Sequence, residues 1–311
     1  MTMAPTSDDR TEEDWLAIKD VARLTGVNPV TLRAWERRYG LIVPRRTPKG
    51  HRLYNDGHVQ RIKAIVNWLN RGVAVSQVKP LLETPQPVIA DEHSQWHGLQ
   101  QEMLIAVSRL AERHLDDSFN RATALYPPRT LYEHLLMPLL KSLEQRWHKR
   151  FGSALERSLF HSWLRTKLGN RLYHSDRQHN GAPLLLVNLC DQHFDPGLWC
   201  CAWLASSTGC PVEVLEWAVP SAELPLVLEP LAPRGLLLYA SQSLNGGYLR
   251  RQLPRLVATA GVPVLLAGPA VLIHQTELRE FPGLILANDP LAVLEAMQTN
   301  PLFAVDQEKS R

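Results

Sequence analysis

The chain has 311 residues, and 34 lysine and arginine side chains against 31 aspartates and glutamates give it a formal net charge of +3. A chain of this length has room for two or three domains, and an apolar share of 45% supports sizeable cores. No run of about eighteen apolar residues suggests a membrane span, and residues 1–10 lack the apolar core of a secretory signal. We therefore expect a globular, cytoplasmic protein without a membrane partner.

The charge is unevenly distributed along the chain. Residues 1–14 carry one arginine and five acids, a net −4, and predict a polar tail. Residues 15–80 carry 13 lysines and arginines against three acids, a net +10. A positive field concentrated on one small unit attracts a polyanion, chiefly by releasing its counterions. A solvated basic surface is the alternative, and the motifs within this segment favour DNA.

Two short helices are expected first in this basic segment. Residues 18–27 predict a helix and turn, and residues 28–41 predict a second helix, because Asn28 before Pro29 is a good helix start. Leu32 and Trp35 recur at helical spacing and are expected to pack toward two residues of the first helix, Val21 and Leu24. Arg33 and Arg37 then face the other way and are the candidates to enter a major groove, where a guanidinium grips a guanine edge or a phosphate.

A basic hairpin follows at residues 44–54, with Thr47–Gly50 as its turn, because Pro48 and Gly50 suit their turn positions. A basic helix beside a basic hairpin is typical of a winged helix-turn-helix on DNA. A further helix from Asn55 and another near residues 75–82 complete a unit that spans residues 15–83.

The segment from Trp15 to Leu82 closely resembles the MerR family of transcriptional regulators, through Ile18-Lys-Asp-Val-Ala-Arg-Leu-Thr-Gly-Val27 and Thr31-Leu-Arg-Ala-Trp-Glu-Arg-Arg-Tyr39. The resemblance implies a homodimer or higher homo-oligomer on inverted repeats in double-stranded promoter DNA, with RNA polymerase as a partner at promoters. The wing is expected to touch phosphates, which set register without reading bases. The expected DNA contacts are Arg33, Arg37, Arg38, Tyr39, Arg45, Lys49, His51, Arg52 and Tyr54.

Two more domains are expected after a proline-containing linker at residues 84–94. Residues 95–178 predict a four-helix bundle, with apolar stripes at helical spacing. One stripe is Leu99, Met103, Ala106, Val107 and Leu110; a second is Leu131, Leu135, Leu139, Leu143 and Trp147; a third is Leu155, Leu159, Trp163 and Leu168.

Residues 182–300 predict an α/β domain, because five short apolar strand candidates alternate with helical stretches before a tail at residues 301–311. This alternation is typical of a Rossmann-like, doubly wound five-stranded parallel sheet. Ligands of such sheets lie beyond the carboxyl ends of the strands, which here are followed by Asp191–His193, Ser241–Ser243 and Ala267–Pro269.

This domain order resembles cobalamin-binding regulators of the CarH and LitR type, and MlrA-type regulators of biofilm genes, which share the architecture. The resemblance implies that His193 is an axial ligand of cobalt, and that the other cofactor contacts are Asp191, Ser241, Gly268 and Trp147. An acid beside the imidazole fixes its tautomer and raises its basicity.

The chain departs from the cobalamin pattern at two places. Gly197 comes one residue late after His193, and Arg157-Ser158 stands where the photoreceptor type has Glu-His. Two hypotheses therefore stay open: a regulator whose C-terminal half senses adenosyl- or methylcobalamin or another small molecule, and the same regulator with a degenerate, cofactor-free half used for oligomerisation or protein interaction.

Neither an enzyme nor a structural metal site is expected. Ser241, Cys200 and Cys201 lack a neighbouring histidine in a recognisable nucleophile arrangement. The four cysteines lack the spacing of a zinc site, and in a reducing compartment they are expected to be buried apolar residues: Cys190, Cys200, Cys201 and Cys210.

Overall fold

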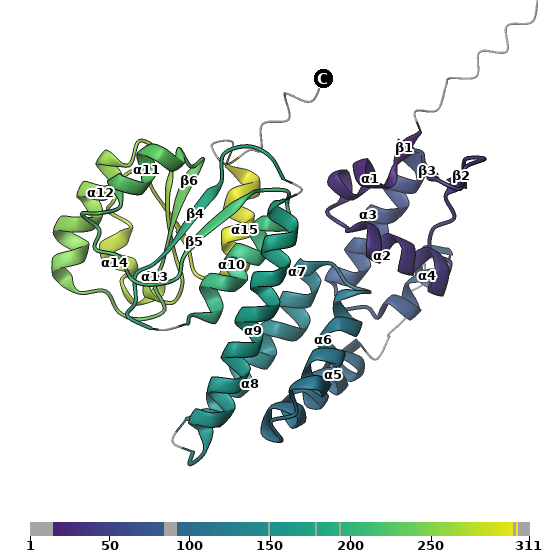
Figure 1. The fold of residues 1–311 in the computed structure, drawn as a ribbon, viewed down its shortest axis with the longest axis horizontal. Coiled ribbons are helices and arrows are strands. Elements are labelled where there is room, and N and C mark those ends of the chain that lie inside the picture. The colour runs from purple at the N-terminus through teal and green to yellow at the C-terminus, as the bar shows by residue number, and fades with distance from the viewer. Residues whose placement is uncertain are drawn as a thin grey trace, which may run out of the picture. The chain divides into compact units, whose positions relative to one another are not determined.

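In the computed structural model, the described residues are 15–83, 92–148, 150–177, 179–192, 194–300 and 303. They form two compact units: the first comprises the chain up to His97 together with Asn120–Thr130, and the second comprises Gly98–Phe119 and the chain from Leu131 onward. Figure 1 labels the elements of both units. Among the described residues, every helix is too short or too polar to cross a membrane. The predicted tail 1–14 lies outside these residues, as do most of the predicted linker 84–94 and all of the predicted tail 301–311 except Phe303.

The first unit begins with a three-stranded antiparallel sheet and four helical segments. The strands are ordered β1-β3-β2, so the short strand β1 joins the expected hairpin as a third strand that the sequence patterns did not predict. The elements are β1 (Leu16–Ala17), α1 (Ile18–Thr25), α2 (Pro29–Ala34), the π-helical turn η1 (Trp35–Tyr39), β2 (Arg45–Arg46), β3 (Arg52–Tyr54), α3 (Asp56–Asn70) and α4 (Val75–Glu83).

The predicted second helix is observed as α2 continued by η1. The Asn28 side chain accepts hydrogen bonds from the backbone N–H groups of Val30 and Thr31 at 2.8 and 2.9 Å, which satisfies two donors at the helix start. Gly40 ends η1 with a φ of +58°, a left-handed conformation that glycine adopts without strain.

The expected packing of the two helices is correct for all but one residue. Val21, Leu32 and Trp35 are each 0% exposed. Leu24 was wrongly expected to join them, since it lies in the last turn of α1, where the chain leaves the helix at Gly26, and is 53% exposed.

Four longer helices, joined by hydrogen bonds within the second unit, make the bundle. Gln100 of α5 donates to Ser142 of α8 at 2.9 Å, Ser118 of α6 donates to Glu102 of α5 at 2.7 Å, and the Trp163 indole of α9 donates to Asp116 of α6 at 3.1 Å. The bounds are α5 (Glu92–Ser108), α6 (Glu112–Thr123), α7 (Pro128–Leu131), η2 (Tyr132–Leu136), α8 (Met137–Trp147) and α9 (Ser153–Asp176).

The predicted stripes of the bundle are confirmed unevenly. The second stripe, Leu131 to Trp147, is buried throughout. The first and third stripes were extended too far, because Leu110 is 47% and Leu155 67% exposed. In α9 the buried side is instead formed by Phe160 and Leu164, each 0% exposed, together with Trp163 and Leu168.

A parallel sheet in the order β5-β4-β6-β7-β8 forms the rest of the second unit, which confirms the predicted doubly wound fold. In this order the chain reverses direction across the sheet between β4 and β6, where such folds place ligands. The strands are β4 (Leu184–Asn188), β5 (Val212–Leu215), β6 (Gly235–Tyr239), β7 (Val264–Ala267) and β8 (Leu284–Ala287).

Helices cover both faces of this sheet, as Figure 1 shows. On one face α10 (Pro196–Ser206) packs against α15 (Pro290–Thr299), and α9 of the bundle packs on α10. On the other face, alternate strand residues such as Leu185, Leu236 and Leu266 form a core with the remaining helices. These are α11 (Pro225–Leu231), η3 (Tyr248–Gln252), α12 (Leu253–Thr259), α13 (Ala270–Ile273) and α14 (Gln275–Leu278).

Candidate DNA interface and cofactor edge

The second helix of the first unit presents three arginines to solvent. Arg33 on α2 and Arg37 and Arg38 on η1 are exposed, and Tyr39 at the end of η1 is half-buried. The opposite side of the same segment is anchored by Leu32 and Trp35, which are fully buried. The basic side therefore belongs to a helix that is held in a fixed orientation.

The hairpin presents a second set of cations. Arg45, Lys49 and His51 are exposed, and the turn between them is closed by a bond from the Gly50 N–H to the Thr47 carbonyl at 2.8 Å. The Arg45 guanidinium lies 5.3 Å from the centre of the Trp15 ring, so the aromatic face positions this cation.

Glu36 joins the helix to the hairpin, a residue that the sequence patterns did not single out. Its carboxylate accepts a hydrogen bond from Arg46 at 2.6 Å and a very short one from Arg52. Burial works to raise the pKa of this carboxyl, but the hydrogen bonds and charges of the two arginines outweigh it and hold the pKa below its usual value. In the sequence, Glu36 is a single acid between Arg33 and Arg37, and this is the signal that could have identified it.

Two of the expected DNA contacts are changed by this arrangement. Tyr54 is a correction: it is only 1% exposed, its ring packs edge-on against His58 at 5.9 Å, and burial raises the pKa of its hydroxyl. Arg52 is half-buried with its guanidinium engaged by Glu36, so it stiffens the hairpin rather than standing free.

Three of the predicted cofactor residues follow strands at the carboxyl edge of the sheet. Asp191 after β4 is exposed, Ser241 after β6 is half-buried, and Gly268 follows β7. His193, the predicted cobalt ligand, lies outside the described residues. The acid beside Ser241 is Asp195, which the sequence patterns missed.

Asp195 is 3% exposed and begins helix α10 by accepting the Gly197 N–H at 2.9 Å. Burial raises the pKa of this carboxyl, and the nearby Ser241 hydroxyl opposes the rise. Among the described atoms, the second Asp195 oxygen and the Ser241 hydroxyl have no hydrogen-bond partner of good geometry.

Tyr239, the last residue of β6, fills the space at this edge where the resemblance implies a cofactor. A Cβ atom at Gly197 would collide with the Tyr239 hydroxyl, and a Cβ at Gly268 would lie 3.1 Å from the Tyr239 ring and 2.6 Å from the Ala240 carbonyl oxygen. Tyr239 is 4% exposed. Both glycines thus have a packing role, and the room their missing side chains leave is taken by this chain's own tyrosine.

Trp147, the predicted cofactor contact on the bundle, is 3% exposed and makes contacts within the bundle. Its indole donates to Glu156 at 3.1 Å, and its ring packs against Phe160 and His161. The His161 ring in turn lies 5.1 Å from that of Phe194, which follows β4 and is 8% exposed. Aromatic side chains therefore pack between α9 and this edge of the sheet.

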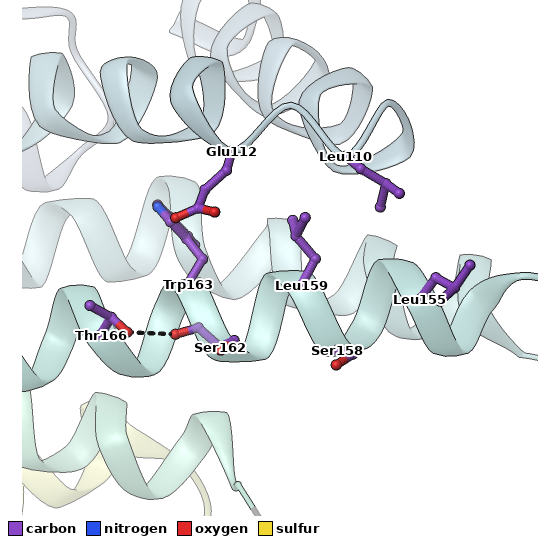
Figure 2. A pocket seen from close by; sticks show the side chains of 8 residues that line it. All are labelled: Leu110, Glu112, Leu155, Ser158, Leu159, Ser162, Trp163 and Thr166. Carbon is purple, nitrogen blue, oxygen red and sulfur yellow. Dashed lines mark hydrogen bonds between the residues drawn. The ribbon is translucent and has the colours of Figure 1, made fainter.

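A hollow of about 410 Å³ opens elsewhere, between α9 and the junction of α5 and α6. Figure 2 shows Leu155 and Leu159 of α9 and Leu110 of the junction along it, with Glu112 across from Trp163. None of the predicted cofactor residues lines it. The four cysteines are buried and form no disulfide with one another, and the described residues contain no group of three or more His, Cys, Asp or Glu side chains suited to a metal ion.

Comparison with known proteins decides the family. Residues 16–84 match the model of the MerR HTH family regulatory protein. The HTH-type transcriptional regulator MlrA of Escherichia coli (strain K12) is 36% identical over 202 residues, which cover 64% of this chain and 78% of MlrA. The chain belongs to the MerR family. It is a DNA-binding transcriptional regulator of the MerR type.

Three further matches of this MerR-family regulator extend beyond its DNA-binding unit. The HTH-type transcriptional repressor CarH of Myxococcus xanthus is 29% identical over 277 residues, covering 83% of this chain and 90% of CarH. Residues 99–171, in the helical region, match a B12 binding domain model. The methanol:cobalamin methyltransferase complex MtaBC of Methanosarcina barkeri superposes with a TM-score of 0.35 and 14% identity, covering 75% of this chain and 90% of that one, a likeness too distant to inform function.

Proposed function

We propose that this regulator places α2 and η1 in the major groove of promoter DNA and lays the β2–β3 hairpin along the flanking phosphates. The observation that carries the proposal is the pairing of two exposed cationic surfaces through Glu36, which accepts hydrogen bonds from both Arg46 and Arg52. Arg33 and Arg37 would read base edges, and Arg38, Tyr39, Arg45, Lys49 and His51 would contact the backbone. The predicted boundaries of this unit, residues 15–83, stay a prediction.

A homodimer or higher homo-oligomer on an inverted repeat, with RNA polymerase as partner, completes the proposal. Its support is the family membership alone, because two copies of a helix-turn-helix read the two halves of a palindromic site. Light scattering of the chain with and without a selected duplex tests it, and a monomer on DNA contradicts it.

Two substitutions test the contact surfaces. Arg33→Ala should weaken binding to the specific promoter site by about 1–3 kcal/mol, because a base-edge contact is lost. Arg45→Ala should weaken binding to every duplex and make its salt dependence shallower by about one unit. Arg251→Ala, which removes an exposed arginine of η3 in the second unit, is the control. If neither substitution changes a gel shift on the gene's own upstream region, the contact surfaces are wrongly assigned.

For the C-terminal half, we favour a cofactor-free module for oligomerisation or protein interaction. The supporting observation is Tyr239, whose ring takes the room at Gly197 and Gly268. A buried tyrosine that packs against two glycines takes up room at this edge of the sheet and stabilises it.

Cobalamin sensing is the second candidate, and the match of residues 99–171 to a B12 binding domain favours it. Incubation with adenosyl- and methylcobalamin, desalting and a visible spectrum separate the two. Wild-type protein without retained colour supports the cofactor-free module. Retained colour that vanishes in His193→Ala contradicts it and identifies the cobalt ligand.

A further inference from the structure

The first unit contains a segment from far along the chain. Asn120–Thr130, which covers the end of α6 and the start of α7, groups with the winged helix-turn-helix, whereas the residues on both sides of it belong to the second unit. We call Asn120–Thr130 the bracing segment. Phe119, directly before it, packs its ring edge-on against Trp163 of α9.

The bracing segment holds the second half of the DNA-reading helix. Trp35 is 0% exposed, and its indole N–H donates to the Leu125 carbonyl at 2.8 Å, across 90 positions of the sequence. A buried indole N–H needs such an acceptor, because an unpaired buried donor is costly. Trp35 lies between Arg33 and Arg37, so its position sets the orientation of both cations.

Further contacts attach the same segment to the rest of the unit. The Tyr126 hydroxyl accepts the Val75 N–H at the start of α4, at 3.4 Å, and its ring lies 4.5 Å from that of Trp96. The Thr130 hydroxyl, which is fully buried, donates to Asn70 at the end of α3 at 2.7 Å. The segment is thereby tied to α2–η1, α3 and α4.

We propose that the bracing segment is an integral part of the DNA-binding unit: Leu125 positions α2–η1 by accepting the Trp35 indole N–H, and Tyr126 ties the segment to α4 through the Val75 N–H. The proposal rests on the proposed contact surface, because it gives Arg33 and Arg37 their orientation. The segment is continuous in sequence with the second unit at both ends.

The test compares specific with non-specific binding by the full-length chain. A specific duplex is first selected from a random library with wild-type protein, and a scrambled duplex serves as the non-specific probe. Trp35→Phe keeps an aromatic ring but removes the N–H, so the specific Kd should rise about tenfold, while the non-specific Kd, set by phosphates, should change less than about twofold.

Trp68→Phe is the matched control, because in the described part of the chain the Trp68 indole makes no hydrogen bond and is instead covered by Arg71. It should leave the ratio of the non-specific Kd to the specific Kd at the wild-type level. Tyr126→Phe is a smaller change and should lower this ratio as Trp35→Phe does. It is the variant to measure if Trp35→Phe does not fold.

A measurement without DNA separates this proposal from the contact surface. In protein labelled at the tryptophan indoles, the Trp35 N–H should exchange with solvent far more slowly than that of Trp68. Equal exchange rates, or a wild-type ratio in both Trp35→Phe and Tyr126→Phe while Arg33→Ala lowers it, overturn the proposal. A slow Trp35 exchange with an inert Arg33→Ala keeps the bracing segment and overturns the contact surface instead.

Discussion

At the scale of single residues, the most consequential side chain of the DNA-binding unit is an acid. Glu36 stands in a basic sequence and removes part of the positive charge that attracts DNA. It is retained in a place where it fixes Arg46 and Arg52 in one geometry. The Glu36 carboxylate lowers the attraction of the unit for phosphate. Its hydrogen bonds to two guanidiniums also fix the position of the hairpin relative to α2 and η1.

Glu36→Gln should therefore separate affinity from specificity. Loss of the charge frees both arginines, so binding to non-specific duplexes should stay level or strengthen, while specific binding should weaken by about 1–2 kcal/mol because the hairpin loses its anchor. Anisotropy titrations with both kinds of duplex measure the two effects. Asp20→Asn, which removes an exposed acid of α1 that pairs with Arg23 at 3.4 Å, is the control and should leave specificity unchanged.

His161 predicts how the second unit responds to acid. Burial, aided by the charge of Arg157, lowers the pKa of this imidazole to about 4, from an ordinary value of 6.5. The unfolded chain thus takes up a proton that the folded unit resists, so stability falls as the pH drops from 6.5 toward 4, with a slope of at most about 1.4 kcal/mol per pH unit.

His161→Phe preserves the ring contacts and should flatten the pH dependence of unfolding in that range. Chemical denaturation at about pH 4.5, 5.5, 6.5 and 8 gives the free energy of unfolding as a function of pH. The curves of wild type and variant should be parallel above about pH 7 and should diverge below it. Parallel curves down to pH 4.5 would mean that His161 is protonated equally well in both states.

At the scale of elements, the carboxyl edge of the sheet is packed by its own backbone and by Tyr239. Gly268 has a φ of +99° and lies against the Ala240 carbonyl, so it combines a left-handed backbone with a close approach. The glycine that the resemblance would assign to a cofactor is thus required by the fold itself.

Gly268→Ala should destabilise the second unit by about 2–4 kcal/mol, since the strain of a positive φ is added to a clash with backbone that cannot move aside. Gly209→Ala is the matched control, because Gly209 has a φ of +89° but nothing within 4 Å of its would-be Cβ, so only the strain of about 1 kcal/mol remains. Urea unfolding measures both. Equal losses would show that the close approach at Ala240 relaxes freely.

At the scale of the whole molecule, the small net charge of +3 is the sum of a strongly basic segment at residues 15–80 and a remainder that is net acidic. The positive field of residues 15–80 is expected to attract DNA, and the acidic remainder of the chain is not. The same remainder stays connected to the reading helix through the bracing segment.

Salt should therefore weaken DNA binding steeply despite that modest total. Arg38, Arg45 and Lys49 are the exposed cations assigned to the backbone, and three phosphate contacts per protomer correspond to a slope of about −2.7 in log K against log salt. Titrations of a non-specific duplex between about 50 and 200 mM salt measure the slope. A value near −1 would contradict the proposed number of contacts.

The sequence alone determined the family, the helix start at Asn28 and the alternation of strands and helices in the α/β half, because each depends on neighbouring residues. Asn28-Pro29 specifies a helix start, and alternation of apolar strands with helices specifies a parallel sheet. The resemblance at Thr31–Tyr39 identified the DNA-reading helix for the same reason.

Only the tertiary structure decided which of the predicted contact residues are exposed and which are held by other side chains. Tyr54 is buried, Glu36 engages Arg46 and Arg52, and Tyr239 occupies the room at Gly197 and Gly268. Each depends on side chains brought together from separate elements, and Trp35 meets Leu125 across 90 positions. Local periodicity carries no information about such pairs, because it records which side of an element is apolar and not which partner covers it.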